Sequence, residues 1–443
     1  MKRYFFISIV CLFSISILQA VIKVGDLELN LEHFKLLFVF LSYIILIFSI
    51  FKFDTIHTAT FSKVDLWLIG VLIIWSLISI IRSADIPISN LSTLPRFLGG
   101  ALYGPALLVP FFVFLGGHLL IQYEVFQLSK MTIGYFALLS PLFFIYDAAI
   151  LLAFIGFMPM LILNNEKLTI SQRVYVVIAL IARMTYCILN GERLEFVRLA
   201  YFVVFALLFV NSNIFKGTFN LRITGFVAIL LFIASFGYVY TGNLSPHFSD
   251  PEIVRDIKSF ERNEFNSESH AMVIEDFFKD FDSWPEYLFG RGALGATYSP
   301  QFVILQEITN TKNNVFGFPP GYRLEIESGY LQTILKTGII GLLLMIVIAM
   351  RAIFLGVFRT KNTFTIICAL IVLERYFAMN SGALAEYSMN YILYWISVGG
   401  CLSERIRNTS NVEIYFLLKG GKYYNPKFIK HASIAEIGVK GAL

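Results

Sequence analysis

Long apolar segments follow one another along almost the whole chain, and one polar stretch, Gly242 to Ser328, is long enough to form a layer of its own. Hydrophobic residues make up 57% of the 443 residues and charged residues only 15%. So few charged side chains cannot cover that much apolar surface in water. The sequence therefore predicts an all-α polytopic membrane protein and excludes a water-soluble domain.

Eleven apolar segments approach the length of about 20 residues that a helix needs to cross a bilayer. They are 4–22, 33–51, 64–82, 98–121, 131–163, 174–190, 195–212, 219–241, 329–350, 362–381 and 386–402. Segment 131–163 is too long for one crossing and contains Pro141 and Pro159, so a pair of short or tilted crossings there would give twelve. An N-terminus outside the cytoplasm is the alternative. The opening run to Ala20 also resembles a cleaved signal peptide, although a polytopic chain more often keeps it as its first helix.

The distribution of charge predicts which side of the membrane the polar stretch occupies. It carries 14 acidic and 7 basic side chains, whereas Lys and Arg collect after residue 350 and in the tail. Because basic residues favour the cytoplasmic side, the acidic loop is expected outside. The predicted organisation is N-terminal membrane helices over 1–241, a large extracytoplasmic loop over 242–328, C-terminal membrane helices over 329–402 and a cytoplasmic tail over 403–443.

The loop is expected to contain short helices. A capping Ser or Asp, then Pro and Glu, start the first one, over Ser249–Glu264. A second helix over His270–Trp284 would place Phe277, Phe281 and Trp284 on one apolar face. Two interpretations of that face remain open. It lies on the outer leaflet or covers a cavity, or it packs on the other loop helix.

Ionisable side chains lie within several apolar segments, where each is a candidate functional residue. With the loop outside, Arg183, Arg193, Arg198 and Arg375 would all lie in the outer half of the bilayer. Guanidinium groups bind phosphate through paired hydrogen bonds, so such a cluster favours a lipid-linked pyrophosphate as the ligand. The alternative is that Glu374 beside Arg375, and similar neighbours, form internal ion pairs that only orient helices.

Other chemistries have no support in the sequence. Cys11, Cys187, Cys368 and Cys401 lie in apolar segments without the spacing of a metal site. The chain has no Walker, dinucleotide-binding or HExxH motif. No metal, cofactor or nucleic-acid partner is therefore expected.

Three short motifs resemble those of the bacterial O-antigen polymerase and ligase superfamily. They are Leu189–Arg193 at a helix junction, Leu288–Gly292 in the loop, and Glu327-Ser328 followed by Gly338 and Gly341 at the head of the next helix. In the ligase branch the last motif begins with His, whereas this chain has Glu327. That departure favours the polymerase over the ligase that transfers finished glycan to lipid A. The resemblance also implies a fold similar to the GT-C glycosyltransferases.

The resemblance implies a metal-independent glycosyltransferase of the bacterial inner membrane. Its donor would be an oligosaccharide on undecaprenyl pyrophosphate, and its acceptor another lipid-linked repeat unit. Glu327 is the expected base, with Glu325 second. The expected substrate-binding residues are Arg193, Arg198, Arg291, Arg323, Tyr330 and Trp284, supported by Arg183, Arg375 and Glu374. A chain-length regulator is a candidate partner. A flippase for the same lipid is the competing class, although no internal repeat supports it.

Overall fold

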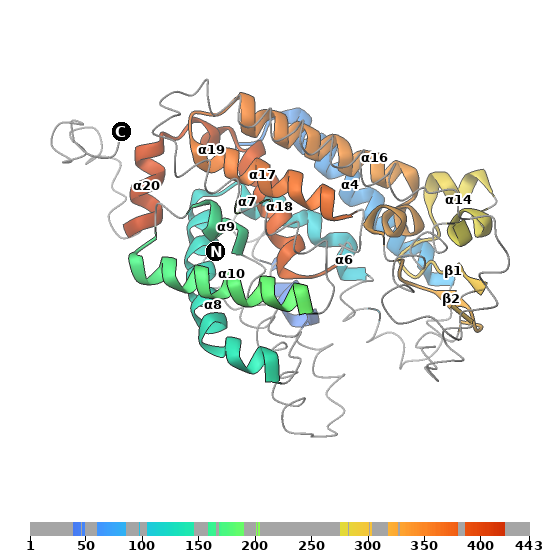
Figure 1. Cartoon of the computed structure of the whole chain (residues 1–443). Helices are drawn as coiled ribbons and strands as arrows, with labels where there is room; N and C mark the ends of the chain where they lie inside the picture. Colours follow the sequence, from blue (N-terminus) through green and yellow to red (C-terminus); the bar gives the residue numbers. More distant parts are fainter. Residues whose placement is uncertain are drawn as a thin grey trace.

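The computed structural model describes residues 39–45, 47–48, 60–85, 97, 104–145, 158–164, 168–189, 201, 203, 275–281, 283–300, 302–303, 318–326, 328–379 and 386–420. This part of the chain is predominantly helical (Figure 1). The Arg193 and Arg198 predictions, the Glu327 prediction and the helix expected over Ser249–Glu264 lie outside the described residues.

The elements follow one another in two groups, before and after residue 250. The first group is α4 (Lys63–Ile81), η1 (Arg82–Asp85), α6 (Gly104–Leu108), η2 (Val109–Phe111), α7 (Phe112–Gly116), α8 (Leu119–Ile145), α9 (Met158–Leu163) and α10 (Ile170–Leu189). The second is α14 (Trp284–Phe289), β1 (Thr297–Tyr298), β2 (Tyr322–Arg323), α16 (Gly329–Phe358), α17 (Thr363–Ala378), α18 (Met389–Leu402), α19 (Glu404–Asn408) and α20 (Asn411–Gly420).

Two helices of the described chain, α4 and α16, are long and apolar enough to cross a membrane. A third crossing follows if the segments Ala106–Gly116 and Leu119–Ala137, which meet at a bend of 113°, form one broken span. The prediction of an all-α membrane protein is confirmed at this level. The number of crossings and the side on which the loop lies remain predictions.

Helices α4 and α16 pack side by side with opposite directions, because contacts join the start of one to the end of the other (Figure 1). At one end, Arg351 of α16 pairs with the buried Asp65, which also caps α4 through Ser62. At the other end, the indole Nε1 of Trp75 donates to the carbonyl oxygen of Thr337 at 2.7 Å. These two contacts fix the register of the two helices along their common axis.

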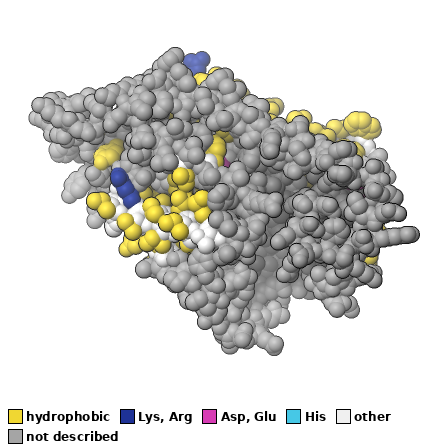
Figure 2. Space-filling model, viewed as in Figure 1, with side chains coloured by type: hydrophobic (Ala, Val, Ile, Leu, Met, Phe, Trp, Pro, Cys, Tyr) yellow, Lys and Arg dark blue, Asp and Glu magenta, His cyan; other side chains and the backbone are white. Residues whose placement is uncertain are grey.

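The outer surface of this helix pair is apolar, as a lipid-facing surface must be. On α16 the exposed side chains recur every three or four residues, at Leu343, Val347, Met350 and Phe354. Exposed Ile and Leu side chains also line α4. Most described side chains on the face drawn in Figure 2 are likewise hydrophobic.

The interior of the helical bundle is formed around α18, which packs on α7, α16 and α17. Glycines bring α7 and α18 into backbone contact. A Cβ on Gly116 would lie 2.2 Å from the carbonyl oxygen of Ile396, and one on Gly399 would lie 2.2 Å from that of Val113. Small residues allow this close approach in membrane helices, where dispersion contacts take the place of hydrophobic burial.

The apolar segments that the structure describes match helices, but two are divided differently from the prediction. Segments 4–22 and 219–241, and all but two residues of 195–212, lie outside the described residues. The segment 98–121 is interrupted by η2, where Pro110 stands in the first turn of a 3₁₀-helix. The 131–163 segment contains the end of α8, which begins earlier at Leu119, and the separate short helix α9. Residues 146–157 between these two helices lie outside the described part of the chain, so the expected pair of crossings remains a prediction.

The loop forms a small layer against the ends of α4 and α16 (Figure 1). Residues 275–280 are helical, and Phe277 and Phe281 are buried against Ile326, Leu331 and Leu335. This apolar face is therefore buried inside the protein, where it packs on α16 and on Tyr287 of α14. Packing on the loop helix expected over 249–264 stays a prediction, because those residues lie outside the described part of the chain. Trp284 does not belong to that face, because it begins α14 and is 78% exposed.

Candidate functional site

The loop and α16 meet through two glycines, Gly290 and Gly338, that pack backbone to backbone. Gly338 interrupts α16 with φ 71° and ψ 179°, a conformation that essentially only glycine adopts. A Cβ there would lie 2.1 Å from the carbonyl oxygen of Leu288. Gly290 has φ 70°, and its Cβ would lie 2.5 Å from the nitrogen of Gly338. The two glycines thus join two of the three motifs of the sequence in one junction.

The interruption at Gly338 exposes carbonyl groups that a continuous helix would use itself. In a regular helix each carbonyl accepts from the N–H four residues later. Here the carbonyl of Leu335 accepts from the backbone N–H of Arg291 at 2.7 Å, and that of Thr337 accepts from Trp75. The loop and α4 therefore complete the hydrogen bonding of the broken helix, which stabilises the break.

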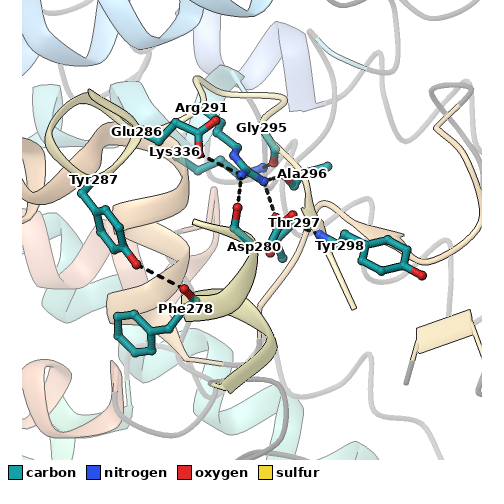
Figure 3. Close-up of polar contacts among 10 residues, drawn as sticks. All are labelled: Phe278, Asp280, Glu286, Tyr287, Arg291, Gly295, Ala296, Thr297, Tyr298 and Lys336. Atoms are coloured by element: carbon teal, nitrogen blue, oxygen red, sulfur yellow. Dashed lines mark hydrogen bonds and ion pairs between the residues drawn. The ribbon is translucent and has the colours of Figure 1, made fainter. Parts of the chain in front are cut away.

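Arg291 is the centre of the loop layer (Figure 3). Its Nη1 donates to the carboxylate of Asp280, and to the carbonyl oxygen of Ala296 at 2.8 Å. Its Nη2 donates to the carboxylate of Glu286 at 2.9 Å and to the backbone carbonyl oxygen of Asp280 at 2.7 Å. Burial lowers the pKa of Arg291, but the hydrogen bonds to Glu286 and Asp280 outweigh burial and leave that pKa raised. The guanidinium group is thus held by protein groups, and its expected role toward pyrophosphate remains a prediction.

Two aspartates extend this network into the β1–β2 hairpin. Asp280 also accepts from the hydroxyl of Thr297 and the backbone N–H of Tyr298, both at 3.0 Å. Asp276 accepts from the hydroxyl of Ser299 at 2.5 Å. The acidic side chains described in this part of the loop therefore act largely as hydrogen-bond acceptors that shape it.

Lys336 of α16 is buried just beneath the loop, with 3% of its surface exposed. Its Nζ donates to the carbonyl oxygen of Gly295 at 2.9 Å. The negative charge of Glu325 also attracts the Lys336 ammonium group. Lys336 lines a cavity of about 20 Å³ together with the polar side chains Ser76, Gln332, Thr333, Thr337 and Tyr391. That volume holds about one water molecule, so the cavity is a place where polar groups converge and is too small for a sugar.

A second buried basic residue, Arg375, contacts Tyr391, which lines the same cavity. The guanidinium carbon of Arg375 on α17 is 5.6 Å from the centre of the Tyr391 ring, a cation–π contact. Tyr330 lies six residues before Lys336 on α16, and its hydroxyl donates to the carbonyl oxygen of Tyr376 at 2.7 Å. A buried lysine, a buried arginine and several tyrosines thus lie on the parts of α16, α17 and α18 near the loop.

The structure places the remaining predicted site residues as follows. Glu325 is exposed close to the mouth of α16, whereas Glu374 and Arg183 are buried, on α17 and α10 respectively. Arg323 in β2 lies over the ring of Phe302, 4.9 Å from its centre. Ile326 and Ser328 flank Glu327, and Ser328 caps α16 by accepting from the N–H of Leu331.

Sequence reasoning did not select Lys336, although one signal pointed to it. It is a basic residue within an apolar helix, between Leu335 and Gly338, and such residues are functional candidates by default. Its contact with Gly295 depends on the break in α16, which brings the loop down to the level of Trp75. A glycine in a helical pattern does not by itself predict such a break.

No protein-family model, curated protein or solved structure matches the chain. Among the described residues, no group of three His, Cys, Asp or Glu side chains comes together as metal ligands. Lys336 and Arg375 are buried, Lys336 donates to Gly295 of the loop, and the exposed carboxylate of Glu325 lies shortly before α16.

Proposed function

We propose that the protein is a membrane glycosyltransferase of the O-antigen polymerase type. The observation that carries this proposal is the contact between Gly290 and Gly338, because it unites two motifs that are 48 positions apart in the sequence. Two distant motifs whose residues come into contact are expected to form one functional site. Buried cations next to that junction suit an anionic leaving group, which is the chemistry that a pyrophosphate-linked donor requires.

The proposed reaction transfers a glycan between two lipid-linked molecules. The bond between the anomeric carbon of the donor and its pyrophosphate oxygen breaks, and a bond to a hydroxyl oxygen of the acceptor forms. The proton of that hydroxyl passes to a carboxylate, and undecaprenyl pyrophosphate leaves with the electron pair. The protein has to position both substrates, stabilise the departing charge and accept one proton.

The proposed role of each residue follows from the chemistry of its side chain. Glu327, between Ile326 and the helix cap Ser328, is the proposed base, with Glu325 as the second candidate. Arg193 and Arg198 are proposed to bind pyrophosphate, since their planar groups form paired hydrogen bonds. Lys336 joins this proposal as a buried positive charge beneath the junction, where low dielectric strengthens its field.

In this proposal the protein crosses the bacterial inner membrane eleven or twelve times. The loop, including α14 and the β1–β2 hairpin, lies in the periplasm, where lipid-linked repeat units are assembled into polymer. The basic turn between α16 and α17 and the helix α19 lie on the cytoplasmic side, in agreement with the distribution of Lys and Arg.

The profile of surface lipopolysaccharide on a gel, from a strain lacking this protein, tests the proposal. A polymerase deletion removes the ladder and leaves lipopolysaccharide with a single repeat unit. Loss of both, with lipid-linked polymer accumulating, would identify a ligase and contradict the assignment of Glu327. An unchanged ladder would contradict the whole superfamily. Loss of all repeat units, with lipid-linked single units retained inside, would identify a flippase.

A further inference from the structure

The turn between α16 and α17 encloses an open pocket of about 440 Å³, at the end of the molecule opposite the loop. It is lined by Phe354, Phe358, Arg359, Thr360, Lys361 and Asn408. Nothing in the proposed glycosyl transfer uses this pocket, because the loop and the junction lie at the other end of α16.

The pocket combines an apolar half and a cationic half. Phe354 and Phe358 lie one turn apart on α16, with ring centres 5.4 Å apart. Phe354 is also the last member of the exposed stripe that begins at Leu343, so the apolar half continues the lipid-facing surface of the helix. The other half carries Arg359 and Lys361, which are both exposed.

These two cations are not neutralised by the part of the protein that the structure describes. Arg351, one helical turn before the pocket, is paired with Asp65, but neither Arg359 nor Lys361 forms an ion pair with a described residue. The described charges at this end are also unequal. They comprise the basic residues Lys63, Arg351, Arg359, Lys361, Arg405 and Arg407 and the acidic residues Asp65, Glu404 and Glu413.

The turn that carries Arg359 and Lys361 is held in place by buried hydrogen bonds of the next residue, Asn362. The amide of Asn362 donates to the carbonyl oxygens of Ile406 at 2.8 Å and Thr409 at 2.9 Å, and its oxygen accepts from the N–H of Thr365 at 2.8 Å. The backbone N–H of Lys361 donates to the carbonyl of Arg407 at 2.8 Å. The backbone that carries the two cations is therefore fixed before any ligand arrives, which lowers the entropy lost on binding.

We propose that this pocket binds one anionic phospholipid, whose headgroup phosphate contacts Arg359 and Lys361 and whose acyl chain lies along Phe354. Three observations favour a lipid over a soluble phosphate. The apolar half opens onto the lipid-facing stripe, the cations stand directly beyond the end of a membrane-spanning helix, and basic pockets in that position suit anionic headgroups. The proposal does not depend on the reaction at the other end of the protein.

Native mass spectrometry of the full-length protein in detergent tests this site, with phosphatidylglycerol and phosphatidylcholine as probes. The wild-type protein should retain one phosphatidylglycerol more tightly than any phosphatidylcholine. The double variant Arg359→Gln/Lys361→Gln should bind phosphatidylglycerol about 30-fold more weakly, because each basic residue near a headgroup contributes about one factor of five. The matched control is Lys63→Gln/Arg405→Gln, which removes the same charge at this end but does not line the pocket, and it should bind as the wild type does.

Two outcomes would overturn the proposal. If the control variant weakens phosphatidylglycerol binding as much as the pocket variant, the attraction is a general effect of charge and there is no site. If glycerol 3-phosphate or pyrophosphate competes at the same concentration as the lipid, the ligand is a soluble phosphate. The variant Phe354→Ala tests the apolar half of the pocket independently. It should weaken binding of phosphatidylglycerol while leaving the charge of the pocket unchanged.

Discussion

An arginine and a lysine lie near each end of α16, but they are largely buried near one end and exposed near the other. At the loop end, Arg291 and Lys336 are surrounded by carboxylates and carbonyl oxygens of the protein. At the other end, Arg359 and Lys361 are exposed beside an open pocket. A buried cation contributes to the fold and to local electrostatics, whereas an exposed cation is available to a ligand. Burial therefore determines the role of each residue more than its type.

The ends also differ in how their backbones are joined. The loop end depends on the contact between Gly290 and Gly338, in which two left-handed or otherwise glycine-specific conformations meet. At the other end, the side chain of Asn362 joins the segments through hydrogen bonds to the backbone of Ile406 and Thr365. The first arrangement tolerates no added atom, so the largest effects of substitution are expected there.

The substitution Gly338→Ala is expected to have the largest effect. Its Cβ would collide with the backbone at Leu288, and its conformation is unfavourable for any L-residue, so the free energy of unfolding should fall by about 3 kcal/mol or more. Polymer formation should be lost with it. Thermal unfolding of the purified protein measures the first effect. Gly70→Ala is the matched control, because no atom lies within 4 Å of its new Cβ, and it should be harmless.

Removal of the charge of Arg291 tests whether this residue shapes the loop or binds substrate. Arg291→Gln leaves Asp280 and Glu286 without their partner and should destabilise the loop layer by about 2 kcal/mol, since the pair is partly exposed. Amide hydrogen exchange over 283–300 should then become faster. Unchanged exchange together with weaker binding of the lipid-linked donor would show instead that Arg291 contacts the pyrophosphate.

The substitution Lys336→Met separates a functional buried charge from a structural one. Its loss removes one hydrogen bond to Gly295 but also the cost of burying a charge, so stability should change by no more than about 1 kcal/mol. Polymer formation should nevertheless fall at least about tenfold, as expected for a charge that stabilises a developing anion. A fall in stability of more than about 2 kcal/mol would assign Lys336 to the fold alone.

The smallest effect on stability is expected at the other end. Arg359→Gln and Lys361→Gln remove exposed charges that pair with no described residue, so unfolding free energy should change by less than about 0.5 kcal/mol. Thermal unfolding in a detergent without added phospholipid provides the measurement. A loss comparable to that of Arg291→Gln would mean that both ends use their cations in the same way.

Within the described residues, apolar segments of the sequence predicted the long helices but not the break inside α16. Apolar runs of the right length mark α4 and α16 because a bilayer demands a minimum span. The break at Gly338 could not be foreseen, since it forms only when Gly290 arrives from 48 positions earlier in the chain. The same holds for Lys336, whose burial beneath the loop follows from that break. Phe277 and Phe281 were correctly placed on one apolar face, but periodicity does not specify that the face packs on α16.

In the proposed function, this chain itself extends a lipid-linked glycan. The most direct test reconstitutes the purified protein in lipid nanodiscs with one substrate, a single repeat unit on undecaprenyl pyrophosphate, and follows the products on a gel. The wild-type protein should give a ladder of lipid-linked polymer, and Glu327→Gln should give none in the same nanodiscs. Single repeat units that remain unextended with the folded wild-type protein would contradict the proposed function.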